Sequence, residues 1–260
     1  MNHDLKSYAV RKIKSATIFW AILLAGTILL ANFLPQVVTV SNTAGEEELP
    51  IQCVDMNEKK VSLTFDAAWG NENTEKILEI LSEKDVKATF FLTGVWIETF
   101  PKEVMSIVAA GHDLGNHSAN HRSMSLISQE EKTKEIMAVH NKVKELAGYE
   151  MNLFRPPYGD FNGELVSTAK ENGYHTIQWD VDSLDWKDYG ADSIVQTVIQ
   201  NENFGNGSII RCHNDAKYIA EALDELITKL MDQGYEIVPV SELIYQEDYH
   251  IDNKGKQILN

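Results

Sequence analysis

Residues 61–70 read VSLTFDAAWG, an apolar stretch with period-two alternation that ends at the carboxylate of Asp66. This pattern predicts a buried β-strand. The next segment, residues 74–84, places Ile77 and Leu81 on one face, as an amphipathic helix does. A strand followed directly by a helix is the repeating unit of a parallel sheet with helical crossovers.

The same alternation of strand-like and helix-like segments continues along the chain. Further strands are expected at residues 87–92, 112–116, 152–155, 174–179, 207–212 and 236–240. Helices are expected at residues 101–111, 128–147, 163–172, 191–201 and 218–232. Ser128 and Glu131 form a capping-box pattern at the start of the longest of these helices. Seven strands separated mostly by helices predict an α/β fold with a parallel sheet.

The N-terminal segment differs from the rest of the chain. Residues 15–34 carry no charge and follow four basic residues, Lys6, Arg11, Lys12 and Lys14. Such a run is long enough to cross a bilayer as a helix, and its basic flank predicts that residues 1–14 are cytoplasmic. We therefore expect a single-pass anchor in the cell membrane with the rest of the chain outside the cytosol. A signal peptide cleaved at a poor site within residues 41–45 is the alternative, and it also means export.

The rest of the chain divides into three further parts. Residues 35–57 mix Pro, Ser, Asn, Thr and Gly with the acidic run Glu46-Glu47-Glu48 and suit a linker. Residues 58–247 hold the strand and helix pattern and are expected to form one catalytic domain. Residues 248–260 are polar, and we expect them to form a frayed tail.

Charge excludes one class of partner. The 260 residues include 23 basic and 39 acidic side chains, which give a formal net charge of −16. This balance argues against nucleic acid and against anionic polymers held by electrostatic capture. Two cysteines are too few for a disulfide framework. We expect a monomer that acts on a glycan.

Polar side chains follow successive predicted strands, where each strand ends. They are Asp66, the pair His117 and His121, Arg155, Asp185 and His213. Because the carboxyl ends of parallel strands share one edge, we expect these groups to meet at one mouth.

The residue types suggest metal-assisted hydrolysis. Two histidines four residues apart lie on one side of a helical turn, so both imidazoles can reach one metal ion. Asp66 is placed to act as a general base on water. His213 is placed to protonate a leaving nitrogen, with Asp185 holding its ring and raising its pKa. Arg155 can pair with Asp66 and keep it ionised.

Over roughly residues 57–245 the chain resembles the polysaccharide deacetylases of carbohydrate esterase family four. Five stretches, in order, are similar to the motifs of that family: Thr64-Phe65-Asp66, His117-Ser118-x-x-His121, Arg155-Pro156-Pro157-Tyr158-Gly159, Asp182-x-x-Asp185-Trp186 and the strand that ends in His213. Any one of these motifs is weak alone, but five at the ends of successive strands are a specific signal.

The resemblance implies a distorted (β/α)7 barrel and metal-dependent removal of N-acetyl groups from an extracytoplasmic amino-sugar polymer, for which we expect peptidoglycan. The expected metal is zinc, with cobalt, manganese or nickel as alternatives. By position in the motifs, the resemblance implies that Asp66 is the base, that His213 is the acid, and that His117 and His121 are metal ligands. It also implies that Arg155 and Asp185 adjust the pKa of the base and the acid. The backbone N–H of Tyr158 would stabilise the oxyanion. Trp69 and Trp186 follow strand ends and are candidates to stack on sugar rings.

The chain departs from the family pattern at Ala67, where the family usually has a second Asp that serves as the third metal ligand. Catalytic zinc sites generally use three protein ligands and a water molecule. We therefore expect a weakened but functional site, with a catalytically inert, membrane-tethered glycan-binding protein as the alternative. Relatives linked to spore and cell-wall remodelling also vary here, and the sequel Trp69-Gly70 is similar to theirs, so a role in sporulation is a further expectation.

The second departure is Arg211, where the family often has a Leu that lines the pocket for the acetyl methyl group. By strand alternation, Arg211 points the same way as His213. It can then narrow that pocket or bind a carboxylate of the substrate. A local bulge that turns Arg211 to solvent is the other reading.

Overall fold

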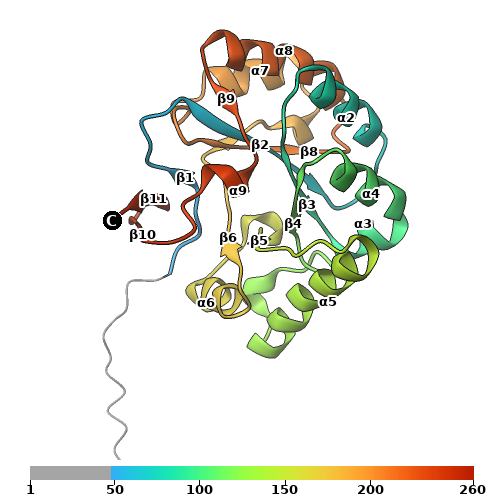
Figure 1. Ribbon diagram of the computed structural model, residues 1–260, viewed down its shortest axis with the longest axis vertical. Helices are drawn as coiled ribbons and strands as arrows, with labels where there is room; N and C mark the ends of the chain where they lie inside the picture. The colour runs from blue at the N-terminus through green and yellow to red at the C-terminus, as the bar shows by residue number, and fades with distance from the viewer. Residues whose placement is uncertain (1–47) are drawn as a thin grey trace, which may run out of the picture. The chain divides into compact units, whose positions relative to one another are not determined.

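The computed structural model describes residues 48–260, whose central feature is a curled sheet of parallel strands (Figure 1). Its strands are β2 (Lys60–Ala67), β3 (Thr89–Leu92), β4 (Asp113–Asn116), β5 (Leu153–Phe154), β6 (His175–Thr176), β7 (Val181–Asp182), β8 (Ile209–His213) and β9 (Glu236–Ile237). The order is β6-β5-β4-β3-β2-β8-β7, with β9 paired to the start of β2, and every pairing is parallel. Because β6 and β7 form the two ends of this order, the sheet is a curled half-barrel rather than the closed ring that a (β/α)7 barrel would have.

Helices lie around the outside of the sheet (Figure 1). Six of them match the sequence prediction to within a few residues: α2 (Thr74–Glu83), α4 (Pro101–Ala109), α5 (Gln129–Ala147), α6 (Gly163–Glu171), α7 (Ala191–Ile199) and α8 (Ile219–Asp232). Short helices that the sequence did not predict are α3 (Gly94–Thr99), α9 (Val240–Leu243) and the 3₁₀ turns η1 (Met124–Leu126), η2 (Pro157–Gly159) and η3 (Asp185–Lys187).

Strand β2 shows how the sequence positions the site. Its apolar residues Val61, Leu63 and Phe65 are fully buried in the main hydrophobic core. The alternate residues point to the opposite face, where Thr64 Oγ1 donates a hydrogen bond of 2.8 Å to a backbone carbonyl of β8. Asp66 lies one step further along this polar face, so the alternation that makes the strand also delivers a carboxylate to the carboxyl end of the sheet.

Helix α5 begins where the sequence predicts. Ser128 Oγ accepts the Glu131 N–H at 3.3 Å, and a Glu131 carboxylate oxygen accepts the Ser128 N–H at 3.2 Å, which completes the capping box. An N-cap of this kind contributes about 1 kcal/mol to stability. Gly148 ends the helix with φ of 65°, in the left-handed region where a side chain would be strained.

The expectation of a frayed tail is wrong, because residues 248–260 contribute two strands to a second sheet, together with Cys53–Val54 of the expected linker. In it β1 (Cys53–Val54) pairs parallel with β11 (Lys256–Leu259), which pairs antiparallel with β10 (Tyr249–Ile251). Gln257, fully buried in β11, exchanges two hydrogen bonds with the backbone of Tyr245. The polar composition of the tail hid these inward-facing contacts.

The expected cytoplasmic segment 1–14 and membrane anchor 15–34 lie outside the described residues. Within residues 48–260, no helix combines the length and the apolar character needed to span a membrane.

Candidate active site

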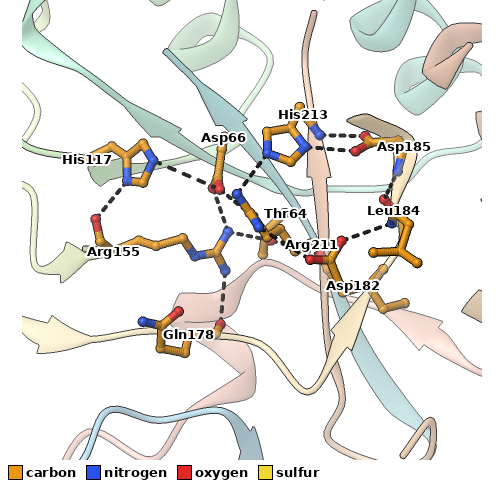
Figure 2. Close-up of polar contacts among 12 residues, drawn as sticks. Thr64, Asp66, His117, Arg155, Gln178, Asp182, Leu184, Asp185, Arg211 and His213 are labelled. Carbon is orange, nitrogen blue, oxygen red and sulfur yellow. Dashed lines mark hydrogen bonds and ion pairs between the residues drawn. The ribbon is translucent and has the colours of Figure 1, made fainter. Parts of the chain in front are cut away.

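Asp66 lies at the centre of the polar groups at the carboxyl end of β2 and is 2% exposed (Figure 2). Its Oδ1 is 2.7 Å from Arg155 Nη1, and its Oδ2 is 2.8 Å from Arg211 Nε. Burial alone would raise the pKa of Asp66, but the positive charges of Arg155 and Arg211 hold it well below its usual range. Asp66 is therefore a carboxylate at any physiological pH.

Arg155, which follows β5, is the fixed partner of this carboxylate. Its guanidinium lies 4.0 Å from the centre of the Phe91 ring and donates to Thr64 Oγ1 at 2.8 Å and to the Gln178 carbonyl at 3.1 Å. The side chain is completely buried. The expected pairing of Arg155 with Asp66 is thus present, in a geometry that leaves the guanidinium little freedom.

The His117 and His121 imidazoles face each other, with their Nε2 atoms 3.3 Å apart. His117 Nδ1 lies 2.7 Å from the Arg155 carbonyl, which can only accept, so Nδ1 carries the proton and Nε2 keeps its lone pair. Asp66 Oδ2 is 4.0 Å from the same Nε2 atom. The three groups that the sequence predicted to converge therefore do so.

The backbone that carries the two histidines differs from the expected helical turn. Ser118 and His121 have φ of 66° and 52°, left-handed values that no right-handed helix contains. Asn116 Oδ1 accepts the Ser118 N–H at 3.0 Å, and Ser118 Oγ accepts the His121 N–H at 3.1 Å. These local bonds fold the segment into a tight loop that brings the rings together.

Both imidazoles are neutral in this site. Burial lowers the pKa of His117 to about 3, and burial also lowers the pKa of His121 below its ordinary value. His121 Nδ1 is buried with no hydrogen-bond partner among the described residues. Neutral imidazoles keep the lone pairs that metal binding requires.

His213, at the end of β8, is held by Asp185 through two bonds. Its Nδ1 lies 2.7 Å from Asp185 Oδ1, and its backbone N–H donates to Asp185 Oδ2 at 2.7 Å. Burial alone would lower the pKa of His213, but the hydrogen bond from Asp185 and the charges of Asp66 and Asp185 raise it above its ordinary value. The pair has the arrangement of a general acid with its orienting carboxylate.

Arg211 points into the site and not to solvent. Its Nη2 lies 2.9 Å from His213 Nε2 and its Nη1 lies 3.3 Å from Asp182 Oδ2, in addition to the bond from Nε to Asp66 (Figure 2). The flat face of the guanidinium packs 4.1 Å from the Trp179 ring centre. Trp179 also packs against a hydrophobic cluster, and Asp182 Oδ1 also accepts the Leu184 N–H at 2.9 Å. The sequence did not predict that these two side chains hold Arg211.

Exposed aromatic rings lie next to His121 and Asp185. Trp69 is 68% exposed and meets the His121 ring edge-on at 5.5 Å between ring centres. Tyr158, left-handed at φ of 61°, meets the same ring at 4.5 Å. Trp186, on η3 beside Asp185, is also exposed. Rings placed in this way offer apolar faces to a sugar.

The donor set fits a metal ion in part. Two nitrogen ligands of a tetrahedral zinc ion, each about 2.0–2.1 Å from it, lie roughly 3.4 Å apart, close to the separation of the two Nε2 atoms. Ala67, the position at which the resemblance implies a third ligand, is fully buried in the hydrophobic core and offers no ligand atom. In the part of the chain that the structure describes, no group of three or more His, Cys, Asp or Glu side chains is arranged to hold a metal.

Comparison with known proteins identifies the class. Residues 54–177 match the family described as Polysaccharide deacetylase. A Bacillus cereus protein named peptidoglycan-N-acetylglucosamine deacetylase is 36% identical over 196 residues, which are 74% of this chain and 91% of the relative. Peptidoglycan-N-acetylmuramic acid deacetylase PdaC of Bacillus subtilis is 37% identical over 192 residues, 74% of this chain but only 40% of that longer relative.

Two solved structures are similar in fold to this chain, and the protein that they contain is described as a pseudoenzyme. BA3943 of Bacillus anthracis, described as a CE4 family pseudoenzyme, matches with a TM-score of 0.73 and 34% identity over 83% of this chain and 74% of its own. A mutant of BA3943 described as having restored enzymatic activity matches at 0.72 and 38%, over 76% and 71% of the two chains.

The chain belongs to the polysaccharide deacetylase family, carbohydrate esterase family four. Its members include hydrolases that act on amide bonds and are named for the deacetylation of peptidoglycan, so the resemblance noted in the sequence is confirmed at this level.

Proposed function

We propose that this protein removes N-acetyl groups from an extracytoplasmic amino-sugar polymer, namely peptidoglycan, by hydrolysis. The proposal rests on three groups that lie close together: the ionised carboxylate of Asp66, the neutral imidazoles of His117 and His121, and the hydrogen-bonded pair of His213 and Asp185. The names of two relatives, one for N-acetylglucosamine and one for N-acetylmuramic acid, support peptidoglycan as the polymer.

Proton movement follows from the positions of the base and the acid. Asp66, ionised and buried, accepts a proton from the water that attacks the acetyl carbonyl. His213, whose Nδ1–H is fixed by Asp185, delivers a proton from Nε2 to the sugar nitrogen as the C–N bond breaks. The backbone N–H of Tyr158 stabilises the oxyanion.

His117 and His121 would hold a divalent ion, for which zinc is our first choice. When bound, it supplies Lewis-acid polarisation of the carbonyl. Trp69 and Trp186 would hold the sugar rings at the mouth.

The test is acetate release from peptidoglycan and from N-acetylated glucosamine oligomers by the full chain, with added zinc or cobalt. We expect release that Asp66→Asn abolishes. Absence of release at every metal concentration, from protein shown to be folded, would reject the proposal.

A second candidate, an inert glycan-binding protein, is favoured by one set of observations. Ala67 removes a ligand, Arg211 lies against the base, and BA3943, which is similar to this chain, is described as a pseudoenzyme. Peptidoglycan binding that survives both Asp66→Asn and metal removal, without any acetate release, would support this candidate over the enzyme.

We also propose that residues 15–34 anchor the protein in the cell membrane as a single span, with the folded residues 48–260 outside the cytosol. The uncharged run and its basic flank support this proposal. Protease added outside intact cells should digest the folded domain if this topology holds. Protection of that domain in intact cells, with digestion after lysis, would contradict it. A role in sporulation remains an expectation from the resemblance.

A further inference from the structure

Arg211 has a partner inside the protein for each of its three nitrogens. These partners are Asp66 Oδ2 at 2.8 Å, Asp182 Oδ2 at 3.3 Å and His213 Nε2 at 2.9 Å. One guanidinium therefore contacts both the proposed base and the proposed acid.

We propose that Arg211 is a built-in cation that competes with a divalent metal ion for Asp66 and so sets the metal affinity of the site. This inference rests on the proposed function only in taking the His117 and His121 pair as the place where the ion binds. Arg211 is in this sense a positioning residue, since it acts through Asp66.

The competition is for one oxygen atom. Asp66 Oδ2 is the carboxylate oxygen that lies 4.0 Å from His117 Nε2, and the same Oδ2 accepts the Arg211 Nε–H. Asp66 Oδ1 is occupied by Arg155. An ion held by the imidazole pair would thus meet a carboxylate that two arginines have already neutralised.

Electrostatics sets the direction of the effect. At an effective dielectric constant of about 20, two like unit charges about 4 Å apart repel enough to weaken binding roughly a thousandfold if neither moves, and the double charge of a divalent ion makes the repulsion larger still. Arg211 is 15% exposed and can relax, so the measured effect will be smaller. Asp182 and Trp179 oppose that relaxation, because they hold the guanidinium from two other sides.

Arg211 also occupies the nitrogen of His213 from which the proposed acid would release its proton. Because His213 Nδ1 is directed at Asp185, Nε2 is the nitrogen that accepts the Arg211 Nη2–H. Nε2 is also the atom from which the acid would deliver its proton. A productive state of the site therefore requires Arg211 Nη2 to move away from His213 Nε2.

The test measures zinc and cobalt affinity of the full chain by competition with a chromophoric chelator, without substrate. Arg211→Met should bind zinc at least about tenfold more tightly than the natural protein, because the competing charge is gone. Arg211→Lys keeps the charge and should stay within about threefold of the natural protein. Adding Ala67→Asp to Arg211→Met should tighten binding about tenfold again by supplying a third ligand, whereas Ala67→Asn in its place should not.

Lys132→Met is the matched control. Lys132 is a fully buried cation paired with Glu164 at 2.8 Å in another part of the fold, so its loss should change stability but not zinc affinity. Circular dichroism and thermal unfolding establish that each variant is folded.

Two results would overturn the inference. One is a folded Arg211→Met protein whose zinc affinity stays within twofold of the natural protein, including the case in which neither binds. The other is an equal gain in Arg211→Lys and Arg211→Met, which would assign the effect to shape rather than charge. Acetate release from the same samples is a separate readout. Tighter zinc binding without acetate release in any variant would keep this inference and reject the proposed function.

Discussion

The carboxylate of Asp185 holds His213 at two points, one oxygen on the ring Nδ1 at 2.7 Å and the other on the backbone N–H at 2.7 Å. Ring and backbone are therefore fixed by one group, which itself is 1% exposed. This double contact fixes the tautomer of His213 and directs Nε2 toward Asp66 and Arg211.

Asp185→Asn should lower kcat for acetate release by about 10²–10⁴-fold, because the ring loses both its tautomer and its charge partner. The natural carboxylate raises the pKa of His213, against the effect of burial. An acid works only while protonated, so activity falls as pH rises through that pKa. The alkaline limb of the pH–rate profile should therefore move to lower pH in the variant. An alkaline limb that stays at the same pH in the variant would contradict the assignment of His213 as the acid. The control is Asp188→Asn, which changes an exposed carboxylate in the same loop.

Asp66→Asn should destabilise the fold by about 3–5 kcal/mol at pH 7, because it leaves the fully buried Arg155 and the partly buried Arg211 without their carboxylate. In the unfolded chain Asp66 protonates near pH 3.8, whereas in the folded protein its pKa lies well below that value. The stability that the carboxylate supplies is thus full above about pH 5 and declines as the pH falls below about 4. Denaturant unfolding measures this at pH 7 and pH 3. The free energies of unfolding of the natural protein and the variant should differ less at pH 3 than at pH 7.

The matched variant for this measurement is Asp224→Asn, which removes the exposed partner of Lys84 at 2.8 Å. A surface pair of this kind is worth about 0–1 kcal/mol. If the difference in free energy of unfolding between Asp66→Asn and the natural protein grows as the pH falls, Asp66 is not ionised in the folded state.

Local patterns in the sequence were enough to predict the main sheet. Alternation in residues 61–66 and the capping box at Ser128 are read from neighbours in the chain, and both are present in the structure. Strands β1, β7, β10 and β11 were not predicted, and each is only two to four residues long. β1 pairs with β11 about 200 residues away, a contact that no local period can indicate. β10 and β11 are neighbours in the chain, but the polar composition of residues 248–260 did not suggest strands.

The sequence was also enough to predict that the site residues converge, but not how the Arg211 side chain is oriented among them. Parallel strands bring their carboxyl ends together whatever the side chains are, so Asp66, His117 and His213 had to meet. The direction of Arg211 remained open, because it depends on Trp179 and Asp182, which reach it from a neighbouring connection. Side-chain contacts of this kind come only from three-dimensional packing.

Metal binding should be unusually insensitive to mild acid. Two histidines with an ordinary pKa of about 6.5 would lose affinity roughly fourteenfold between pH 7.5 and 6.0, since both must be neutral to bind. Burial lowers the pKa of His117 to about 3 and also lowers that of His121. We therefore expect less than about a fourfold loss over this interval for Arg211→Met, the variant with the most readily measured affinity, because at most one of the two rings then gains a proton. Titration with a chelator whose own protonation is corrected for will measure it. A fall of tenfold or more would mean that at least one ring is solvated.

A small residue behind the site supports Arg155. A methyl group at Gly115, in β4, would lie 2.3 Å from the Phe91 ring, and that ring packs 4.0 Å from the Arg155 guanidinium. Gly115→Ala should therefore cost about 1–3 kcal/mol by overpacking and also lower kcat, because displacement of the Phe91 ring disturbs the Arg155 guanidinium that packs on it. Gly205→Ala, where no atom lies within 4 Å, should leave both quantities nearly unchanged. Phe91→Leu should relieve the clash, so the double variant should be more stable than the sum of the single changes predicts. Strict additivity would show that the ring does not transmit the change from Gly115 to Arg155.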